Sequence, residues 1–154
     1  MPLLRSQTLT PEPFFIIRPG RSTDHALILE SWTTTHAGTT NGKDHGIDYF
    51  TGQKDLIRSI LARASTTTRV AADPEDEDAV FGYAVLGHLQ DLIPRIYYAY
   101  VKSDGRNLGV ATALLKDLMA RQITYTHRPP HYIEKLLPSK PQNWVYSYFQ
   151  NFKD

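Results

Sequence analysis

The 154-residue chain contains no cysteine, which excludes disulfide bonds, cysteine nucleophiles and thiolate metal ligands. It has no run of the ~18–20 consecutive apolar residues that a membrane span needs. Its first residues, MPLLRSQTLTPEP, lack the apolar core of a secretory signal. The formal net charge is only +1, so no strong field attracts nucleic acid or a membrane surface. We therefore expect a cytoplasmic protein that binds neither.

The overall amino-acid composition is that of an ordinary globular domain. Hydrophobic residues make up 41% of the chain and charged residues 21%, which is too apolar for a disordered chain. The length fits one domain, since domains usually take ~100–200 residues each. Pro2, Pro11 and Pro13 mark residues 1–13 as a loose N-terminal arm. We expect a single domain over residues 14–154.

Strand-like and helix-like segments alternate along that domain. The order β-α-α-β-β-β-α-β-α-β predicts a mixed α/β (α+β) fold, with a mostly antiparallel central sheet flanked by helices. β-branched and aromatic runs predict the strands, and a period of 3.6 predicts the helices. The expected strands are 14–18, 67–72, 79–86, 95–101, 123–126 and 144–149, and the expected helices are about 22–34, 47–64, 109–122 and 132–137.

The same periodicities predict which side chains face the core. In strand 95–101, Tyr98 and Tyr100 are expected on one face of the sheet and Tyr97 on the other, because successive side chains alternate. The expected inner faces of the first two helices are Ala26, Leu29, Trp32 and Thr33, and then Phe50, Ile57, Ile60, Leu61 and Ala64.

An acidic cluster separates the second and third expected strands. Asp73 and the run from Glu75 to Asp78 put five carboxylates in six positions, interrupted only by Pro74. These residues are either a cation site or the solvated tip of a hairpin. Pro and Asp are turn residues, and nothing in the pattern fixes a ligand geometry, so the sequence favours the hairpin tip.

The segment from Val101 to Ala111 joins a strand to a helix through a glycine-containing loop. The first turn of a helix presents N–H groups without intrahelical partners and a partial positive charge. A glycine at that position lets a diphosphate approach the backbone, so the junction is a candidate anion-binding site. The alternative is that Gly105 serves only a turn and Gly109 only the packing of the helix.

The stretch Arg106-Asn107-Leu108-Gly109-Val110-Ala111 resembles the acyl-CoA-binding motif of the GNAT superfamily of N-acetyltransferases, Gln/Arg-x-x-Gly-x-Gly/Ala. The resemblance covers about fifteen residues in motif and roughly 14–125 in topology. It implies a strand with a bulge that splays from its neighbour to make an acyl slot. It also implies acetyl-CoA as the acyl-donor cosubstrate, bound by Tyr100, Val101, Lys102, Arg106, Asn107, Leu108, Gly109, Val110 and Ala111.

The catalytic groups match the family less well. Many members carry a glutamate base on the strand before the motif, whereas strand 95–101 has no carboxylate and Arg95 lies near that position. Asp91, just before the strand, and His88 are candidates to act as the base through water. Glu30 and His36 are further options, and each of these residues has a plain structural interpretation as well.

The general acid in the family is usually a tyrosine on the helix after the fifth strand. Tyr132-Ile133-Glu134-Lys135-Leu136 is similar to its Tyr-Glu-Lys-Leu-Gly-Phe run. Alignment on Glu-Lys-Leu places Ile133 at the acid position, and the trailing Gly-Phe is absent. Tyr132 is the candidate acid, with core packing as its alternative, and His131 is the fallback.

The resemblance implies an N-acetyltransferase that moves an acetyl group from acetyl-CoA to a primary amine by direct attack. Residues 36–49 would then form the loop that contacts the unidentified amine. The alternative is a non-catalytic GNAT-fold binding or interaction module that has lost its base. No metal is expected, because the one helically spaced histidine pair, His127 and His131, is interrupted by Pro129-Pro130. Apolar residues on both faces of strand 144–149 suggest burial against another surface, with a homodimer as one option.

Overall fold

The computed structural model describes residues 14–37, 47–106, 108–119, 121–127 and 144–147. The arm at 1–13 and the expected helix at 132–137 lie outside these residues. In chain order the elements are β1 (Ile16–Pro19), η1 (Ser22–Asp24), α2 (His25–Ala37), α4 (Ile47–Leu61), β2 (Thr66–Asp73), β3 (Asp76–Gly87), β4 (Arg95–Val101), η2 (Ser103–Gly105), α5 (Val110–Leu115), η3 (Lys116–Leu118), β5 (Ile123–Tyr125) and β6 (Trp144–Tyr146).

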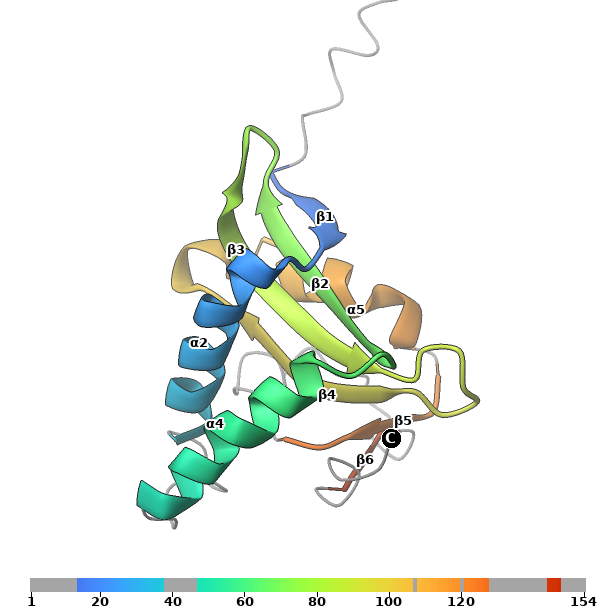
Figure 1. Ribbon diagram of the computed structural model, residues 1–154. Coiled ribbons are helices and arrows are strands. Elements are labelled where there is room, and N and C mark those ends of the chain that lie inside the picture. The colour runs from blue at the N-terminus through green and yellow to red at the C-terminus, as the bar shows by residue number, and fades with distance from the viewer. Residues whose placement is uncertain (1–13, 38–46, 107, 120, 128–143, 148–154) are drawn as a thin grey trace, which may run out of the picture.

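Six strands form one sheet in the order β1-β2-β3-β4-β5-β6 (Figure 1). Neighbouring strands from β1 to β4 are antiparallel, whereas β5 runs parallel to β4 and β6 runs parallel to β5. The predicted mixed fold with a mostly antiparallel sheet is therefore confirmed. No helix among the described residues is long and apolar enough to span a membrane.

Helices cover both faces of the sheet, with α2 and α4 on one face and α5 on the other (Figure 1). Each face has its own buried core, and the two differ in character. The core beneath α5 is almost entirely aliphatic, with Leu86, Ile96, Val101, Leu114, Leu118 and Ile123 among its members. The core beneath α2 and α4 includes the aromatic residues Trp32, Tyr83, Tyr97 and Tyr98.

Helix α2 buries a face that overlaps only partly with the predicted one. Ile28, Trp32 and His36, spaced four residues apart, are buried, and the half-buried Leu29 packs against the same core. The prediction is confirmed for Trp32 and wrong for Ala26, which is exposed, because apolar residues occupy four consecutive positions, 26–29, and so do not select a side of the helix.

Helix α4 buries Ile57 and Ile60 as predicted, together with the polar residue Gln53. The helix ends at Leu61, three residues earlier than expected, and Ala64 is exposed. The buried stripe at 53, 57 and 60 therefore contains one amide side chain, which needs hydrogen-bond partners inside the protein.

Strand β4 carries a bulge at Tyr97. Val85 pairs with Tyr98 and Leu86 pairs with Ile96, so Tyr97 is an extra residue opposite β3. A bulge resets the alternation of side chains along a strand. Tyr97 and Tyr98 consequently both join the core beneath α2 and α4, and Tyr100 packs against the same core. The prediction that Tyr98 and Tyr100 share a face is confirmed, and the placement of Tyr97 on the opposite face is wrong.

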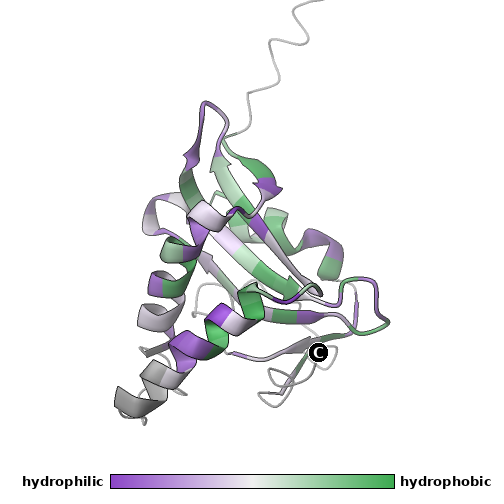
Figure 2. Cartoon of the chain, viewed as in Figure 1, coloured by the Kyte–Doolittle hydropathy of each residue, from purple (hydrophilic) through white to green (hydrophobic). Residues whose placement is uncertain are grey.

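The acidic cluster forms the tip of the β2–β3 hairpin, as the sequence favoured. Pro74 and Glu75 make the turn, and β3 begins at Asp76, so three of the carboxylates belong to the strand itself. The tip is exposed and appears as a hydrophilic end of the hairpin in Figure 2. The Arg21 guanidinium pairs with the Glu77 carboxylate at the side of this tip.

A buried ion pair fastens β1 to the start of the first helical segment. The Arg18 guanidinium donates to both carboxylate oxygens of Asp24, at 2.8 and 2.9 Å, and also to the Glu77 carbonyl. Both side chains are about 5% exposed. Burial alone would raise the pKa of Asp24, but hydrogen bonds from Arg18 and from the Arg21 backbone N–H lower that pKa below its usual value.

Asp24→Asn should destabilise the fold by about 3–5 kcal/mol, because it leaves the Arg18 charge buried without its carboxylate. Urea denaturation at neutral pH measures the free energy of unfolding directly. The matched control is Asp55→Asn, which removes the partner of Arg58 from an exposed pair with side chains 58% and 75% accessible. The control should change stability by no more than about 0.5 kcal/mol. Equal effects of the two substitutions would contradict this interpretation.

Candidate functional site

The turn between β4 and α5 is shaped by Gly109. This residue has φ +84° and ψ 8°, a left-handed conformation that side chains with a Cβ rarely adopt. A Cβ built at this position would meet no heavy atom within 4 Å, so the space outside the turn is open. Gly109 occupies the N-cap position of α5 and has no side chain with which to cap the first turn. The glycine thus turns the chain and also leaves its backbone accessible to a ligand.

The residues of the motif flank this turn on two sides. Val110 and Ala111 are buried in the aliphatic core, whereas Leu108 is 48% exposed. The Arg106 Nε atom donates to the Val101 carbonyl at 3.1 Å, which ties the loop to the end of β4. The Lys102 backbone N–H bonds to the Phe81 carbonyl at 2.8 Å. Asn107, also expected here, lies outside the described residues.

Helix α5 is shorter than the predicted helix at 109–122, since it ends at Leu115 and continues as the short helical turn η3. Arg69 on β2 holds this end in place. Its guanidinium donates to the Leu114 carbonyl at 2.9 Å and to both carboxylate oxygens of Asp117, at 2.7 and 2.8 Å. The hydrogen bond from Arg69 lowers the pKa of Asp117. The anchor fixes α5, and with it the Gly109 turn, against the sheet.

The first two residues of β4 pair with the last two residues of β5. Their register consists of Arg95 opposite Thr124 and Ile96 opposite Tyr125, and the Thr126 N–H still bonds to the Ile96 carbonyl at 3.1 Å. The bulge at Tyr97 comes directly after this point in β4. Beyond it, β4 remains paired with β3, and the register with β5 ends at Tyr125, the last residue of β5. In Figure 1 the two ribbons separate from this point toward the end of β4 that precedes the Gly109 turn.

The hydrogen-bond ladder with β3 determines which peptide groups of β4 face this divergence. Because Lys102 bonds to Phe81 across the ladder, the next bonded pair is Tyr100 with Tyr83. The Tyr100 peptide groups thus point toward β3. Those of Ala99 and Val101 point toward the side of β5.

A buried polar cluster lies on the α2 and α4 side of the divergence. The imidazole of His127, just after β5, contacts the Gln53 amide oxygen through Nε2 at 2.8 Å and the Thr126 hydroxyl through Nδ1 at 3.1 Å. Its ring centroid lies 5.1 Å from that of His36 and 5.0 Å from that of Trp32. Trp32 in turn stacks on Tyr98 at 5.1 Å.

Burial strongly perturbs His127. Removal from water and, to a smaller extent, the neighbouring His36 lower the pKa of this imidazole to about 3, against an opposing hydrogen bond with the Tyr97 backbone. The side chain is thus neutral at physiological pH. The sequence analysis discussed His127 only as a possible metal ligand together with His131. A signal for the cluster was present nonetheless, because Gln53 shares the helical stripe of Ile57 and Ile60.

The structure does not bring all the sequence-predicted catalytic residues to this place. Asp91 lies in the loop before β4, at the end of the strand opposite the Gly109 turn, and pairs with His88 at 3.3 Å. Arg95, which lies near the position of the family's usual glutamate, is 9% exposed and donates to the Tyr97 hydroxyl at 3.2 Å. Tyr132 and His131 lie outside the described residues.

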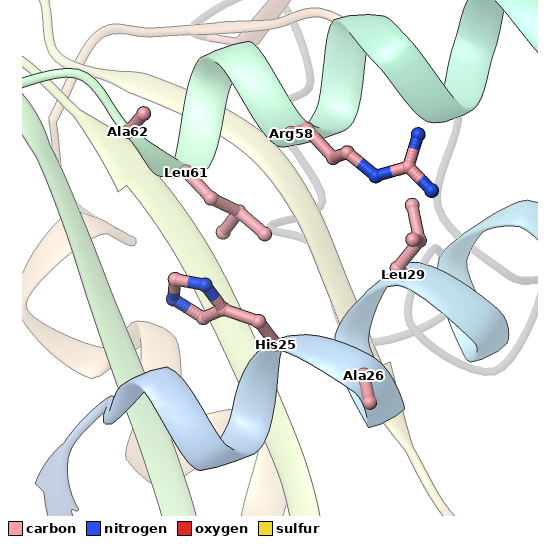
Figure 3. A pocket seen from close by; sticks show the side chains of 6 residues that line it. All are labelled: His25, Ala26, Leu29, Arg58, Leu61 and Ala62. Carbon is pink, nitrogen blue, oxygen red and sulfur yellow. The ribbon is translucent and has the colours of Figure 1, made fainter.

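A groove between α2 and α4 lies on the other side of the sheet from α5 (Figure 3). Its lining is mostly apolar, with His25 and Arg58 as the polar side chains. Its volume of about 290 Å³ is at the lower limit for a ligand pocket. It shares no residue with the Gly109 turn or with the strand divergence.

Removal of His127 should make the stability less dependent on pH. The folded state holds this imidazole neutral, whereas the unfolded chain binds a proton below pH ~6.5. Stability is therefore complete above that pH and falls as pH decreases toward 3, by up to ~1.4 kcal/mol per pH unit. Urea denaturation between pH 7 and 4 should show a shallower loss for His127→Gln than for the unmodified protein. The exposed-site control His25→Gln should keep the original slope, and an unchanged slope in His127→Gln would contradict the prediction.

Comparisons with known proteins give a result at the level of the fold. No model of a known protein family matches the sequence, and no curated protein matches it either. Among solved structures, a putative acetyl transferase from Pyrococcus furiosus aligns over 86% of this chain and 81% of its own, with TM-score 0.52 and 17% identity. A putative GNAT family acetyltransferase from Staphylococcus aureus aligns over 68% of this chain and 88% of its own, with TM-score 0.50 and 15% identity.

A further GNAT-family structure, a putative acetyltransferase from Desulfovibrio desulfuricans, aligns over 69% of this chain with TM-score 0.46 and 17% identity. The alignment spans 64% of that protein's length, so this chain covers slightly less than two thirds of it. Two alignments with TM-scores of 0.50 and above support a common fold. The strand order, the bulge in β4 and its separation from β5 agree with it. This chain has the fold of the GNAT acetyltransferases.

Proposed function

We propose that the protein is an acyl-CoA-dependent N-acetyltransferase, which moves the acetyl group of acetyl-CoA to a primary amine by direct attack. The observation that carries the proposal is the left-handed Gly109 turn beside the divergence of β4 from β5. The turn offers open backbone to a diphosphate, and the divergence leads from it to the bulge at Tyr97. A ligand with a diphosphate at one end and a thioester at the other fits both features.

The binding residues are those of the motif. Backbone N–H groups between Arg106 and Ala111 would hold the pyrophosphate, and the side chains of Lys102 and Arg106 would add positive charge. The pantetheine arm would pair with the main chain of β4. Tyr100 and Val101 were expected there, and the ladder favours Ala99 over Tyr100, because Tyr100 directs its peptide groups to β3.

Bound acetyl-CoA supplies the activated acetyl thioester. The protein must then remove a proton from the amine, stabilise the charge on the carbonyl oxygen and return a proton to the departing sulfur. Direct attack agrees with the absence of cysteine, which removes the commonest acyl-enzyme nucleophile. We keep Tyr132 as the proposed acid and Asp91 as a proposed base that acts through water from the far end of β4.

A non-catalytic binding or interaction module is the second candidate. It is favoured by one specific observation, the absence of any carboxylate from β4 at Arg95–Val101. Such a module would bind acetyl-CoA without turnover, or would not bind it. Two measurements distinguish the two functions: binding of acetyl-CoA in a titration without an amine, and acetyl transfer in the presence of a panel of amines.

Gly109→Asp should abolish acetyl-CoA binding, because it places a negative charge where the pyrophosphate lies. The matched control is Gly109→Asn, which has nearly the same shape and the same backbone strain but no charge. Asp and Asn both tolerate a positive φ better than most residues, and the added Cβ meets no atom within 4 Å, so both variants should fold.

Isothermal titration calorimetry with acetyl-CoA measures the effect. We expect micromolar binding by the unmodified protein, measurable binding by Gly109→Asn and none by folded Gly109→Asp. Retained affinity in Gly109→Asp would show that the diphosphate lies elsewhere.

Tyr132→Phe tests the proposed acid. Loss of the hydroxyl should lower turnover by ~10²-fold or more and leave acetyl-CoA affinity nearly unchanged, because the group acts on the leaving sulfur. Steady-state rates together with calorimetry separate the two quantities. An unchanged rate would assign the acid role to another group.

A further inference from the structure

Three buried side chains form a continuous line of hydrogen bonds beside the strand divergence. The Thr126 hydroxyl lies 3.1 Å from His127 Nδ1, and His127 Nε2 lies 2.8 Å from the Gln53 amide oxygen. Thr126 is fully buried, and His127 and Gln53 are 2% and 3% exposed. Burial of three polar side chains is costly unless they serve one another, and here they do.

We assign the direction of these bonds from the amide oxygen of Gln53, which faces the imidazole. The Gln53 oxygen can only accept, so His127 Nε2 carries the hydrogen and donates it. A neutral imidazole has one protonated nitrogen, which leaves Nδ1 as an acceptor for the Thr126 hydroxyl hydrogen. The result is a hydroxyl–imidazole–carboxamide line, in which the amide orients the imidazole and the imidazole polarises the hydroxyl.

The hydroxyl end of the line is located where the two strands separate. The Thr126 N–H bonds to the carbonyl of Ile96 in β4, and the Thr126 hydroxyl lies 3.5 Å from the carbonyl of Tyr97, the bulge residue. Thr126 therefore lies where the separation of the two strands begins, and the separation opens from there toward the Gly109 turn. Within the proposed function, the thioester end of acetyl-CoA would reach this point.

We propose that Thr126 passes the proton between the acceptor amine and the departing sulfur, with His127 and Gln53 as positioning residues for its hydroxyl. This inference rests on the proposed acetyl transfer. It assigns a role in proton transfer to residues other than Tyr132 and Asp91, and it needs no carboxylate on β4.

The step balances without another reactant. The neutral amine nitrogen forms a bond to the acetyl carbon, and the carbon–sulfur bond breaks with its electron pair on sulfur. The excess proton on nitrogen moves to the Thr126 oxygen while the hydroxyl's own proton moves to His127 Nδ1. The imidazolium then returns that proton through Thr126 to the sulfur. The products are the N-acetyl amide and the free thiol, and the three side chains recover their starting protonation.

The environment of His127 agrees with a carrier that holds the proton only briefly. Burial and His36 make the imidazolium form unfavourable, which is the cause of its lowered pKa. A proton taken up at Nδ1 is therefore readily given to a thiolate, a much stronger base. Gln53 keeps the ring in one tautomer throughout and supplies no charge.

The experiment compares Thr126→Val with Thr126→Ser. Valine has the shape of threonine without the hydroxyl, whereas serine keeps the hydroxyl and loses only a methyl group. Thiol release from acetyl-CoA, with hydroxylamine as a small acceptor, can be followed with a thiol reagent. The protein contributes no background because it has no cysteine. Calorimetry with acetyl-CoA and thermal unfolding of each variant accompany the rates.

We expect Thr126→Val to lower turnover by ~10²-fold or more and Thr126→Ser to stay within about tenfold of the unmodified protein. Acetyl-CoA affinity should be the same in all three proteins, which a defect in folding or binding would not produce. Equal turnover in Thr126→Val and the unmodified protein would overturn the relay. Binding of acetyl-CoA by the unmodified protein without thiol release would overturn it as well.

A second readout does not depend on activity. Nitrogen NMR of the histidine side chains should show His127 neutral, with hydrogen on Nε2, and its Nδ1 resonance should shift when acetyl-CoA is added without an amine. In Thr126→Val that shift should be lost. Acetyl-CoA binding without any effect on His127 overturns the relay alone, whereas absence of acetyl-CoA binding overturns the proposed function together with it.

Discussion

The short register between β4 and β5 is the constraint on which the candidate site depends. Two residue pairs join the first residues of β4 to the last residues of β5, and the bulge at Tyr97 follows directly in β4. A longer register would pair the Ala99 and Val101 peptide groups with β5 and leave no place for an added strand-like ligand. Thr126 and His127 come directly after the last paired residue of β5, so the buried polar cluster lies beside the point where the pairing ends.

The two faces of the sheet contribute differently to this arrangement. Beneath α5, an aliphatic core and the Arg69–Asp117 pair fix the Gly109 turn at one end of the divergence. Beneath α2 and α4, stacked aromatic rings surround a hydrogen-bonded histidine at the other end. In the proposed function, the first face would hold the turn that binds the diphosphate, and the second would give the proton-transfer groups a buried environment in which electrostatic interactions are stronger than in water.

The sequence predicted the fold class and the strand-to-helix turn at Gly109, because both depend on local patterns. The limits of β4 agree with the structure, and Gly109 lies where the strand-to-helix pattern placed it. The position of Tyr97 could not be predicted, since the bulge depends on pairing with β3 and strict alternation fails there. The hydrogen bond between Gln53 and His127 is likewise a tertiary contact. The two residues are 74 positions apart, and no spacing pattern in the sequence predicts that they meet. The local sign of it in the sequence was the position of Gln53 on the same helical stripe as Ile57 and Ile60.

The most direct test is to map acetyl-CoA on the protein by NMR of the backbone amides. The GNAT-like site predicts that the largest shifts on titration fall on Ala99, Val101 and the residues from Leu108 to Ala111, with smaller shifts at Thr126 and His127. Shifts that instead gather in the groove lined by His25 and Arg58, or saturated binding that leaves the Gly109 amide unmoved, would contradict the assignment of the acyl-CoA site.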